Sequence, residues 1–446
     1  MLSSADAALA RRDPALPGLV HLLDPEAFGA LLRGALPTLA IGAIEPRYIR
    51  YKPGTNCLVG YRIGLPEGPT MVYACTYAPS GRAKLARASQ LAAQPGALGV
   101  GGLVFDEEQI ALYSWPHDQA LPFLAHLTNP SNRASLLKQF CPAREDLHQA
   151  ALVHLRYRPE RRYVGRLVGA AGGDALLKLY AANDYHLAHK AAGAFQSEGP
   201  LAIVPPCGAS DHVRGLIFPW RPDEPLDTLV RDERDDLRAV RLAGAALATL
   251  HRQPAPRLPQ TVLATPFVAL DANARTLLAL CPELQPQIGR LCQVFAAQLP
   301  QSLRHPQPLH GDFYADQILI DPERRTATLL DLDNAHWGDP AADLGNFAAH
   351  LQRQVALGRM PGDRAAMLTE VLCAGYAEVA LPPSHQRISL YTALGLLRLA
   401  PEPFRYREPD WPVRIHAIVA TAEAILARVF VAQTTPYQIK EDAYVG

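Results

Sequence analysis

Two stretches of the chain share one pattern of alternating polar and apolar positions. Residues 49–59 read IRYKPGTNCLV, and residues 155–164 read LRYRPERRYV. In each, the alternation leads into a proline and a polar turn and then into a second apolar stretch, which is the pattern of a tight strand pair. We therefore expect two β-hairpins of similar sequence.

The similarity extends downstream of both hairpins. The parallel blocks are VYACTYA (72–78) with ALLKLYA (175–181), and LYSWPHDQAL (112–121) with IFPWRPDEPL (217–226). Within the last pair, Trp115 falls on Trp220 and Asp118 falls on Asp223. Three blocks in the same order indicate an internal repeat. Each copy is predicted to hold a hairpin, a third strand, a helix (about 80–93 and about 183–197), a further strand and a Trp-Pro connector.

After about residue 226 the pattern is mostly helical. Apolar residues recur at helical spacing over a charged face in LDTLVRDERDDLRAVRLAGAALATLH, residues 226–251. Similar patterns cover 265–299, 363–380, 386–400 and 412–432. One β-hairpin is predicted among them, in QILIDPERRTATLLDLD (317–333), around the turn Asp321-Pro322-Glu323-Arg324.

Composition narrows the class of protein. A chain of 446 residues fits two or three domains. Lys plus Arg and Asp plus Glu number 43 each, so no global basic field exists to hold nucleic acid or an anionic membrane. The seven cysteines form no C-x-x-C, which argues against a disulfide framework or a thiolate zinc site. Neither a signal peptide nor an apolar run of about 18 residues is evident, so we expect a cytoplasmic protein.

The segment that carries chemistry is LHGDFYADQILIDPERRTATLLDLDNAHWGDPAADLGNF, residues 309–347. Asp312 precedes the first strand of the predicted hairpin, and Asp331 follows the second. A tight turn brings such positions together, so both carboxylates are expected to face one cavity with the amide of Gln317 between them. One carboxylate can accept a hydroxyl proton, while the other, with an amide oxygen, offers the hard ligands that Mg²⁺ requires.

HGD-x-x-x-x-Q followed by L-D-L-D and GDP-x-x-D-L resembles the aminoglycoside phosphotransferase and choline kinase superfamily. The resemblance implies that Asp312 is the catalytic-loop Asp, that Asp331 binds metal, and that Asp343, with His310, supports the catalytic loop. Gln317 stands where the family has a metal-binding Asn, five residues after the Asp. Glutamine offers the same carbonyl oxygen one methylene further out, so the geometry of the metal site departs from the family pattern.

The resemblance covers roughly 150–430 and implies an α+β fold, the protein-kinase-like bilobal fold with a β-rich N-lobe and a helical C-lobe. A degenerate N-lobe-like repeat precedes it. The predicted domains are 1–145 for the degenerate copy, 146–222 for the kinase N-lobe, and 223–446 for the helical C-lobe with the catalytic loop and metal site.

The same resemblance proposes nucleotide-binding residues in the second copy. Lys178, in ALLKLY, takes the place of the third-strand lysine that holds phosphates, although the usual helix glutamate that pairs with it has no clear counterpart. The hairpin turn lacks the usual glycines and carries Arg158, Arg161 and Arg162. These guanidinium groups either cradle phosphates or form a solvated charge run, and the sequence leaves both readings open. Phe218 and Trp220 line a base pocket or the core between the lobes.

In the first copy, Cys75 stands where Lys178 stands in the second. With no lysine and no C-lobe of its own, this copy is not expected to bind nucleotide catalytically. It is expected to serve as a cap on the kinase unit or as a dimerisation surface, which makes a homodimer a hypothesis. Asp333 and Trp337 are the acceptor-side candidates, and Arg405, Arg407 and Trp411 are weaker ones.

The sequence thus predicts a phosphotransferase that uses Mg²⁺ and ATP or GTP. The acceptor would be a hydroxyl of a small molecule of the sugar, aminoglycoside or amino alcohol type, with no nucleic-acid or membrane partner. Two alternatives remain open. A pseudokinase-like binding or scaffolding protein is favoured by Gln317 and by the missing glycine-rich loop, and a nucleotidyl transferase would use the same fold.

Overall fold

A computed structural model describes residues 2–231, 236–259, 264–302, 306–321, 323 and 325–429. The chain divides into two compact units. Unit 1 comprises Met1–Tyr185, Cys207–Trp220 and Glu402–Pro412, and unit 2 comprises His186–Pro206, Arg221–Pro401 and Val413–Gly446. This division by contacts does not test the boundaries predicted at 145 and 222, which stay a prediction.

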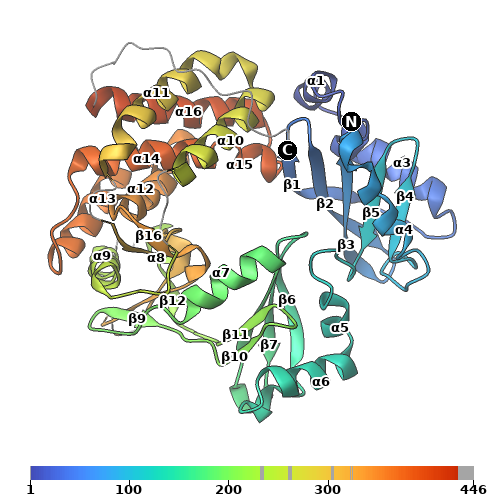
Figure 1. Cartoon of the computed structure of the whole chain (residues 1–446), viewed down its shortest axis with the longest axis horizontal. Coiled ribbons are helices and arrows are strands. Elements are labelled where there is room, and N and C mark those ends of the chain that lie inside the picture. The colour runs from blue at the N-terminus through green and yellow to red at the C-terminus, as the bar shows by residue number, and fades with distance from the viewer. Residues whose placement is uncertain are drawn as a thin grey trace. The chain divides into compact units, whose positions relative to one another are not determined.

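Unit 1 begins with three helices and an antiparallel sheet (Figure 1). The helices are α1 (Ser4–Arg12), α2 (Leu19–Leu23) and α3 (Pro25–Ala35). The strands are β1 (Ile44–Lys52), β2 (Asn56–Leu65), β3 (Gly68–Tyr77), β4 (Gly102–Phe105) and β5 (Ile110–Ser114), in the order β1-β2-β3-β5-β4. The helix expected over about 80–93 is only a 3-10 turn (Pro79–Lys84) and α4 (Ala86–Ser89), because Pro79 and Gly81 disfavour a regular helix at its start.

A second sheet in unit 1 repeats the first, strand for strand. Its strands are β6 (Ala151–Arg158), β7 (Arg162–Val168), β8 (Ala175–Tyr180), β10 (Gly208–Ser210) and β11 (Gly215–Pro219), in the order β10-β11-β8-β7-β6. The register repeats as well. One row of paired residues across the first sheet is Arg50, Leu58, Cys75 and Ala111. The corresponding row across the second sheet is Arg156, Val164, Lys178 and Leu216. The internal repeat predicted from the sequence is therefore confirmed, including the match of Cys75 with Lys178.

Two helices, α5 (Leu124–Thr128) and α6 (Pro130–Phe140), follow the first sheet and supply a core for the second. Leu137 and Phe140 of α6 lie buried in one cluster with Tyr163, Leu177 and other residues of the second sheet. Side chains alternate between the two faces of a strand, so Leu177 and Leu179 face this core while Lys178 projects from the opposite face. The predicted helix after the third strand is α7 (Ala182–Ala192).

Unit 2 is a helical body around short strands (Figure 1). Its helices are α8 (Leu226–Arg231), α9 (Leu237–Arg252), α10 (Ala264–Leu280), α11 (Gln285–Ser302), α12 (Ala341–Ala356), α13 (Gly362–Ala377), α14 (His385–Leu399) and α16 (Trp411–Val429). The short α15 (Glu402–Arg405) belongs to unit 1. The helical stretch predicted over 265–299 is two helices, because Pro282 favours a break between them.

The strands of unit 2 position its loops. The hairpin predicted over 317–333 is β14 (Ile318–Ile320) with β15 (Ala327–Leu329), and its predicted turn includes Pro322 and Arg324, which lie outside the described residues. With β12 (Glu224–Pro225) and β9 (Leu201–Ile203) they form a sheet in the order β12-β14-β15-β9. A separate pair joins β13 (Gln307–Leu309) and β16 (His336–Gly338).

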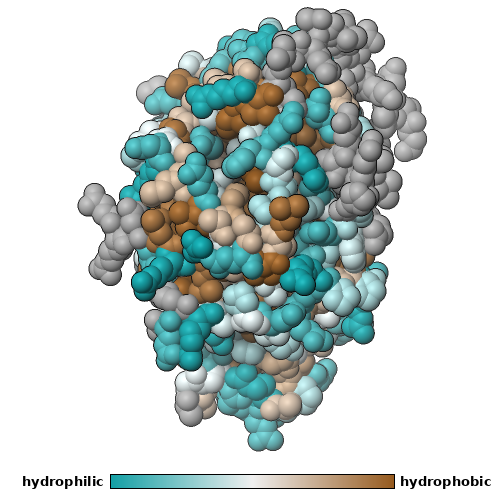
Figure 2. All heavy atoms as spheres, turned by 90° about the vertical axis from the view of Figure 1, so that its left-hand side faces the viewer, coloured by the Kyte–Doolittle hydropathy of each residue, from teal (hydrophilic) through white to brown (hydrophobic). Residues whose placement is uncertain are grey.

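On the face drawn in Figure 2, patches of brown hydrophobic residues are separated by teal hydrophilic ones. Among the described residues, no helix is long and apolar enough to cross a membrane. All seven cysteines lie in the described part of the chain, and no disulfide joins any two of them.

Helices α9 and α13 approach each other closely because Gly244 has no side chain. A Cβ atom at Gly244 would lie 2.0 Å from the backbone oxygen of Leu372 and 2.9 Å from the backbone nitrogen of Tyr376. Neither backbone atom can move without shifting α13. This contact sets the spacing of the two helices that carry His251 and Tyr376, which belong to the site described below.

We predict that Gly244→Ala destabilises the protein by about 1–3 kcal/mol, the usual range for overpacking, despite the better helix propensity of alanine. The matched control is Gly289→Ala in α11, where a Cβ atom would meet nothing within 4 Å. That substitution should stabilise by about 0.5–1 kcal/mol. Urea denaturation of both variants measures the difference, and equal effects at the two positions would contradict the close packing of α9 on α13.

Candidate active site

The candidate site begins at the loop His310-Gly311-Asp312, directly after β13. The backbone at Gly311 is left-handed, with φ +81°, and a Cβ atom there would lie 2.1 Å from the backbone oxygen of Asn334. Only glycine fits both constraints. The HGD tripeptide is thus required by its turn as well as by any chemistry.

A buried carboxylate holds this loop from below. Asp343, in the first turn of α12 and 1% exposed, accepts hydrogen bonds from the backbone N–H groups of His310 (2.7 Å) and Gly311 (2.9 Å). It also contacts Nε2 of His251 at 3.0 Å, and Nδ1 of His251 lies 3.0 Å from the hydroxyl of Tyr376. Burial alone would raise the pKa of Asp343, but the interactions with His251 and His310 hold it below its ordinary value. Asp343 therefore stays ionised at neutral pH.

The ring of His310 ties the loop to the hairpin. Its Nε2 donates to the backbone oxygen of Leu330 (2.7 Å), and its Nδ1 accepts from the N–H of Asp312 (3.3 Å). The N–H of Leu330 donates in turn to the backbone oxygen of Gln317 at 2.8 Å. These bonds join the loop before β14 to the residue that precedes Asp331. The close approach of these segments follows from a short hairpin, as the sequence indicated.

Asp331 and Gln317 offer oxygen atoms next to this network. Asp331 lies two residues after the end of β15 and adopts a left-handed backbone with φ 58° and ψ 49°, which is uncommon for a residue other than glycine. The amide nitrogen of Gln317 donates to the hydroxyl of Tyr314 (3.2 Å), which leaves the carbonyl oxygen of that amide for another partner. A carboxylate and an amide oxygen are ligand types that suit Mg²⁺.

Sequence reasoning missed Arg398 and Asn346. Arg398 of α14 hydrogen-bonds to the side-chain oxygen of Asn346, and the amide nitrogen of Asn346 donates to the backbone oxygen of Phe313 at 3.0 Å. A terminal nitrogen of Arg398 also lies 3.6 Å from a carboxylate oxygen of Asp312. The one available signal was a cation near the end of the otherwise apolar run LYTALGLLRLA.

His350 lies beside this group. Its ring stacks on that of Tyr314, with centroids 3.9 Å apart and planes 11° from parallel. Burial, followed by the charges of Arg398 and Arg353, lowers the pKa of His350 to about 3. His350 is half-buried by surface area, yet a proton on it would be desolvated and would face two cations.

The acceptor-side candidates differ in how they are engaged. The indole nitrogen of Trp337 donates to the backbone oxygen of Ala255 (2.9 Å), and the backbone nitrogen of Trp337 donates to the backbone oxygen of Pro259 (3.0 Å). Trp337 thus packs against the segment after α9. Asp333 is half-buried in the 3-10 turn Leu332–Asn334. Neither placement tests a role toward an acceptor.

Asp339 and Arg407 are held by other partners. The carboxylate of Asp339 accepts from the N–H of Ala341, the first residue of α12, and pairs with Arg387. Arg407 forms a two-armed pair with the buried Asp6, at 2.8 and 2.7 Å, within unit 1. The weak candidacy of Arg407 for an acceptor is therefore not supported.

The predicted nucleotide-binding residues lie in unit 1. Lys178 of β8 is 6% exposed, and its Nζ lies 5.5 Å from the centroid of the Phe218 ring. Trp220 packs under the guanidinium of Arg166 at 4.5 Å. Arg161 is exposed and pairs with Asp184 at 3.4 Å, whereas Arg162 is half-buried in β7. The structure thus brings Lys178 and Phe218 together and leaves the functions of all five untested.

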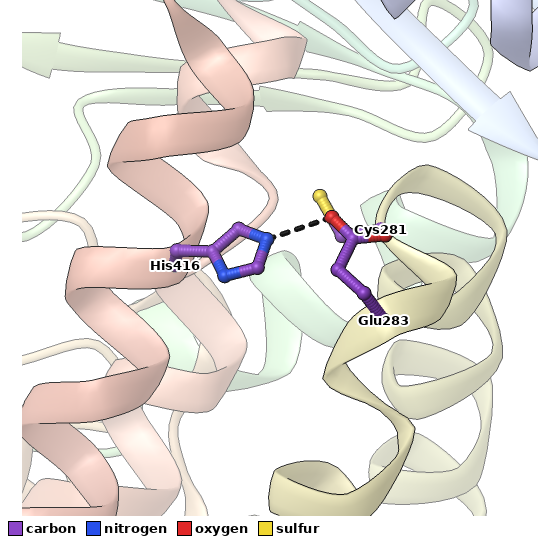
Figure 3. Close-up of side chains that lie close together, drawn as sticks. All are labelled: Cys281, Glu283 and His416. Atoms are coloured by element: carbon purple, nitrogen blue, oxygen red, sulfur yellow. Dashed lines mark hydrogen bonds and ion pairs between the residues drawn. The ribbon is translucent and has the colours of Figure 1, made fainter.

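A separate cluster of possible metal ligands joins α16 to the turn between α10 and α11 (Figure 3). The ligand atoms of Cys281, Glu283 and His416 lie within 4.8 Å of one another, and Nε2 of His416 lies 2.7 Å from Glu283. Because the side chains of His416 and Glu283 are well exposed and already bonded to each other, we assign the cluster to helix packing. His416 is distant in sequence from Cys281 and Glu283, so no spacing signal marked the cluster.

We predict that Asp343→Asn lowers the stability of the protein by about 3 kcal/mol, because asparagine cannot accept from both loop N–H groups while also meeting His251. Thermal and urea unfolding measure the loss. Asp363→Asn, at the exposed start of α13, is the matched control and should change stability by less than about 1 kcal/mol.

The lowered pKa of His350 predicts that the fold loses stability in acid. Because its folded pKa lies below the unfolded value of about 6.5, the unfolded chain takes up the proton first. The contribution of neutral His350 to the free energy of unfolding is complete above the unfolded pKa, and it is lost as the pH falls towards about 3. Relative to pH 7.5, the loss at pH 5.5 is at most about 1.4 kcal/mol.

His350→Phe keeps an aromatic ring on Tyr314 and cannot titrate, so the difference in unfolding free energy between pH 7.5 and 5.5 should shrink by about that amount. His385→Phe, at an exposed position, is the control. An unchanged pH dependence in His350→Phe would show that His350 does not stay neutral in the fold.

Comparisons with known proteins bear on the whole arrangement. A sequence model of the phosphotransferase enzyme family (APH) matches residues 115–381. Among curated proteins, none matches the chain at a significant level. Solved structures with a similar fold include a macrolide 2'-phosphotransferase type I (16% identity, 68% of this chain and 99% of that chain, TM-score 0.43). Another is the choline kinase from Cryptosporidium parvum Iowa II (9% identity, 67% and 96%, TM-score 0.48).

A third is the GDP complex of wild-type aminoglycoside 2'-phosphotransferase-IIIa, at 16% identity over 66% of this chain and 99% of that chain, with a TM-score of 0.44. At such identities and scores the assignment rests on the sequence model, which covers more than half of the chain. It spans the HGD loop, the hairpin and α12, which together form the network around Asp343. The chain belongs to the phosphotransferase enzyme family, and it carries that family's protein-kinase-like α+β fold.

Proposed function

We propose that the protein transfers the terminal phosphoryl group of ATP or GTP, with Mg²⁺, to a hydroxyl group of a small molecule. The observation that carries the proposal is the fixed geometry of the HGD loop. Asp343 holds its backbone, and the ring of His310 ties it to Leu330, which follows β15 and directly precedes Asp331. Phosphoryl transfer depends chiefly on positioning and charge neutralisation, and a doubly anchored loop supplies positioning.

Each residue has a distinct part in the proposed reaction. Asp312 orients the acceptor hydroxyl and receives its proton. The hydroxyl oxygen forms a bond to the terminal phosphorus as the bond from that phosphorus to the bridging oxygen breaks, and the nucleoside diphosphate leaves. Lys178, whose buried position suits a cation that meets phosphate, holds the nucleotide phosphates.

Mg²⁺ fits the residues proposed for it. Asp331 supplies a carboxylate, and the amide of Gln317 is oriented by Tyr314 so that its oxygen is available. Both are hard oxygen ligands. When bound, the ion neutralises charge on the phosphates. The hydrogen bond from Gln317 to Tyr314 also restrains the extra methylene of the glutamine side chain.

Arg398 narrows the choice of acceptor. Its side chain is 54% exposed and lies 3.6 Å from the carboxylate of Asp312, which receives the acceptor. A guanidinium at that distance repels a nearby cation, although solvent screens the effect. We therefore favour a neutral hydroxyl-rich acceptor such as a sugar over a polycationic aminoglycoside or an amino alcohol.

We predict that Mg²⁺ with ATP or GTP at about 100 times its Kd raises the unfolding free energy by about 2.7 kcal/mol, and that Asp331→Ala abolishes this shift. Differential scanning fluorimetry measures it. Glu370→Ala, which removes an exposed carboxylate on α13, is the control and should keep the full shift.

Product analysis then separates the alternatives. Release of nucleoside diphosphate, lost in Asp312→Asn, supports phosphoryl transfer, whereas release of pyrophosphate would assign nucleotidyl transfer. Absence of any shift with either nucleotide, in a protein that unfolds cooperatively, would favour the binding or scaffolding alternative. The acceptor screen should begin with sugars and should include aminoglycosides and amino alcohols as the disfavoured classes.

A further inference from the structure

The turn of the second hairpin lies against the first sheet within unit 1. Glu160, at the tip of that turn and 14% exposed, forms an ion pair with Arg50 of β1. Its other carboxylate oxygen accepts from the side-chain amide of Gln119 and lies 3.8 Å from Sγ of Cys75. Three side chains of the first copy thus surround one carboxylate of the second.

The place where this carboxylate lies is specific. Arg50 and Cys75 belong to the cross-strand row whose counterpart in the second sheet contains Lys178. Glu160 therefore occupies, on the first copy, the position that corresponds to the neighbourhood of Lys178 on the second. A lysine at position 75 is not needed here, because Arg50 from the edge strand supplies the cation.

The backbone of the turn is held as firmly as the side chain. Glu160 adopts φ 58°, and its N–H donates to the buried carboxylate of Asp118 at 2.8 Å. Asp118 also accepts from the hydroxyl of Tyr157 (2.7 Å), and Arg50 donates to the backbone oxygen of Pro159 (3.2 Å). The same Asp118 was matched in sequence to Asp223, which instead pairs with Arg221.

The charge of Arg50 offsets the charge of Glu160 in this contact. Burial disfavours the charge on Arg50, but Glu160 raises the pKa of Arg50 overall. Burial and then Glu160 raise the pKa of Cys75, so its thiol stays protonated and can donate. A half-buried carboxylate with a matched cation and two further neighbours is a built site, because the same carboxylate without a partner would be disfavoured there.

We propose that the first sheet is an internal docking lobe that binds Glu160 as its ligand and thereby fixes the turn carrying Arg161 and Arg162. Arg50 and Glu160 are positioning residues for nucleotide binding, a role that rests on the proposed function. This assignment explains how a copy without a lysine remains useful. It also means that the face of the first sheet around Cys75 is covered by the chain itself, so a dimer would have to use another face.

The test compares Glu160→Gln and Arg50→Met with the control Glu67→Gln, which removes an exposed carboxylate from the β2–β3 turn. Hydrogen–deuterium exchange of the full chain without nucleotide is expected to rise in peptides covering 157–163 in both test variants and not in the control. The double variant should add little to either single one, because both remove the same pair.

Nucleotide binding is measured separately by titration calorimetry with MgATP and MgGTP. We expect the Kd to rise about five-fold or more in both test variants, the lower end of typical coupling between linked sites. The KM for slow nucleotide hydrolysis should rise with it while kcat stays within about two-fold.

Unchanged exchange at 157–163 would overturn the docking lobe whatever the activity. Faster exchange with an unchanged Kd would overturn the positioning role. Faster exchange in a protein whose wild type binds neither nucleotide would support the docking lobe and refute the proposed phosphotransferase instead, so the two failures are distinguishable.

Discussion

The candidate site depends on the hydrogen bonds that the carboxylate of Asp343 makes. It is buried, it accepts from two consecutive N–H groups of the HGD loop, and it meets His251, which is bonded to Tyr376. A charge in such a place is stable only while all its partners are present. We therefore expect a change in any one of three features to disturb the other two: the loop conformation, the spacing of α9 and α13, and the ionised state of Asp343.

This dependence explains the close helix contact at Gly244. His251 lies on α9 and Tyr376 on α13, so their hydrogen bond exists only at the spacing that Gly244 permits. A packing feature of the helical core thus reaches the loop through two hydrogen bonds and one carboxylate. The site is built from the core outward, and Asp312 is the last residue in that chain of contacts.

Much of the fold could be predicted from the sequence, because periodic patterns and repeats are local signals. The two hairpins, the repeat with Cys75 matched to Lys178, and most helices of unit 2 follow from them. The long helix expected over 80–93 was wrong, since Pro79 and Gly81 outweigh the apolar spacing around them. The break at Pro282 was missed for the same reason.

The candidate site was predictable only in part. The HGD motif and the carboxylates of Asp312 and Asp331 lie within one segment of the sequence, residues 309–347. The contacts of Arg398, Asn346 and Tyr376 instead join segments that are distant in sequence. Nothing local in the sequence indicates the bond between His251 and Asp343. Likewise the arginine-rich turn read equally as a phosphate cradle or as a solvated charge run, and the sequence could not show that Glu160 within it has a buried partner.

Several tight turns in the described part of the chain are held in the same way, by a carboxylate that accepts hydrogen bonds from backbone N–H groups. Asp343 binds the N–H groups at Gly311, Asp118 binds the N–H of Glu160, and Asp321 binds those of Glu323 and Arg325. A glycine-rich loop is free to adopt such turns but pays for that freedom in entropy, whereas a carboxylate that accepts backbone hydrogen bonds orders the turn enthalpically. The missing glycines of the second hairpin are therefore compatible with an ordered turn. Anchoring by Asp118 and Arg50 replaces flexibility with a rigid turn, and a rigid turn can present guanidinium groups to phosphates without first being ordered by them.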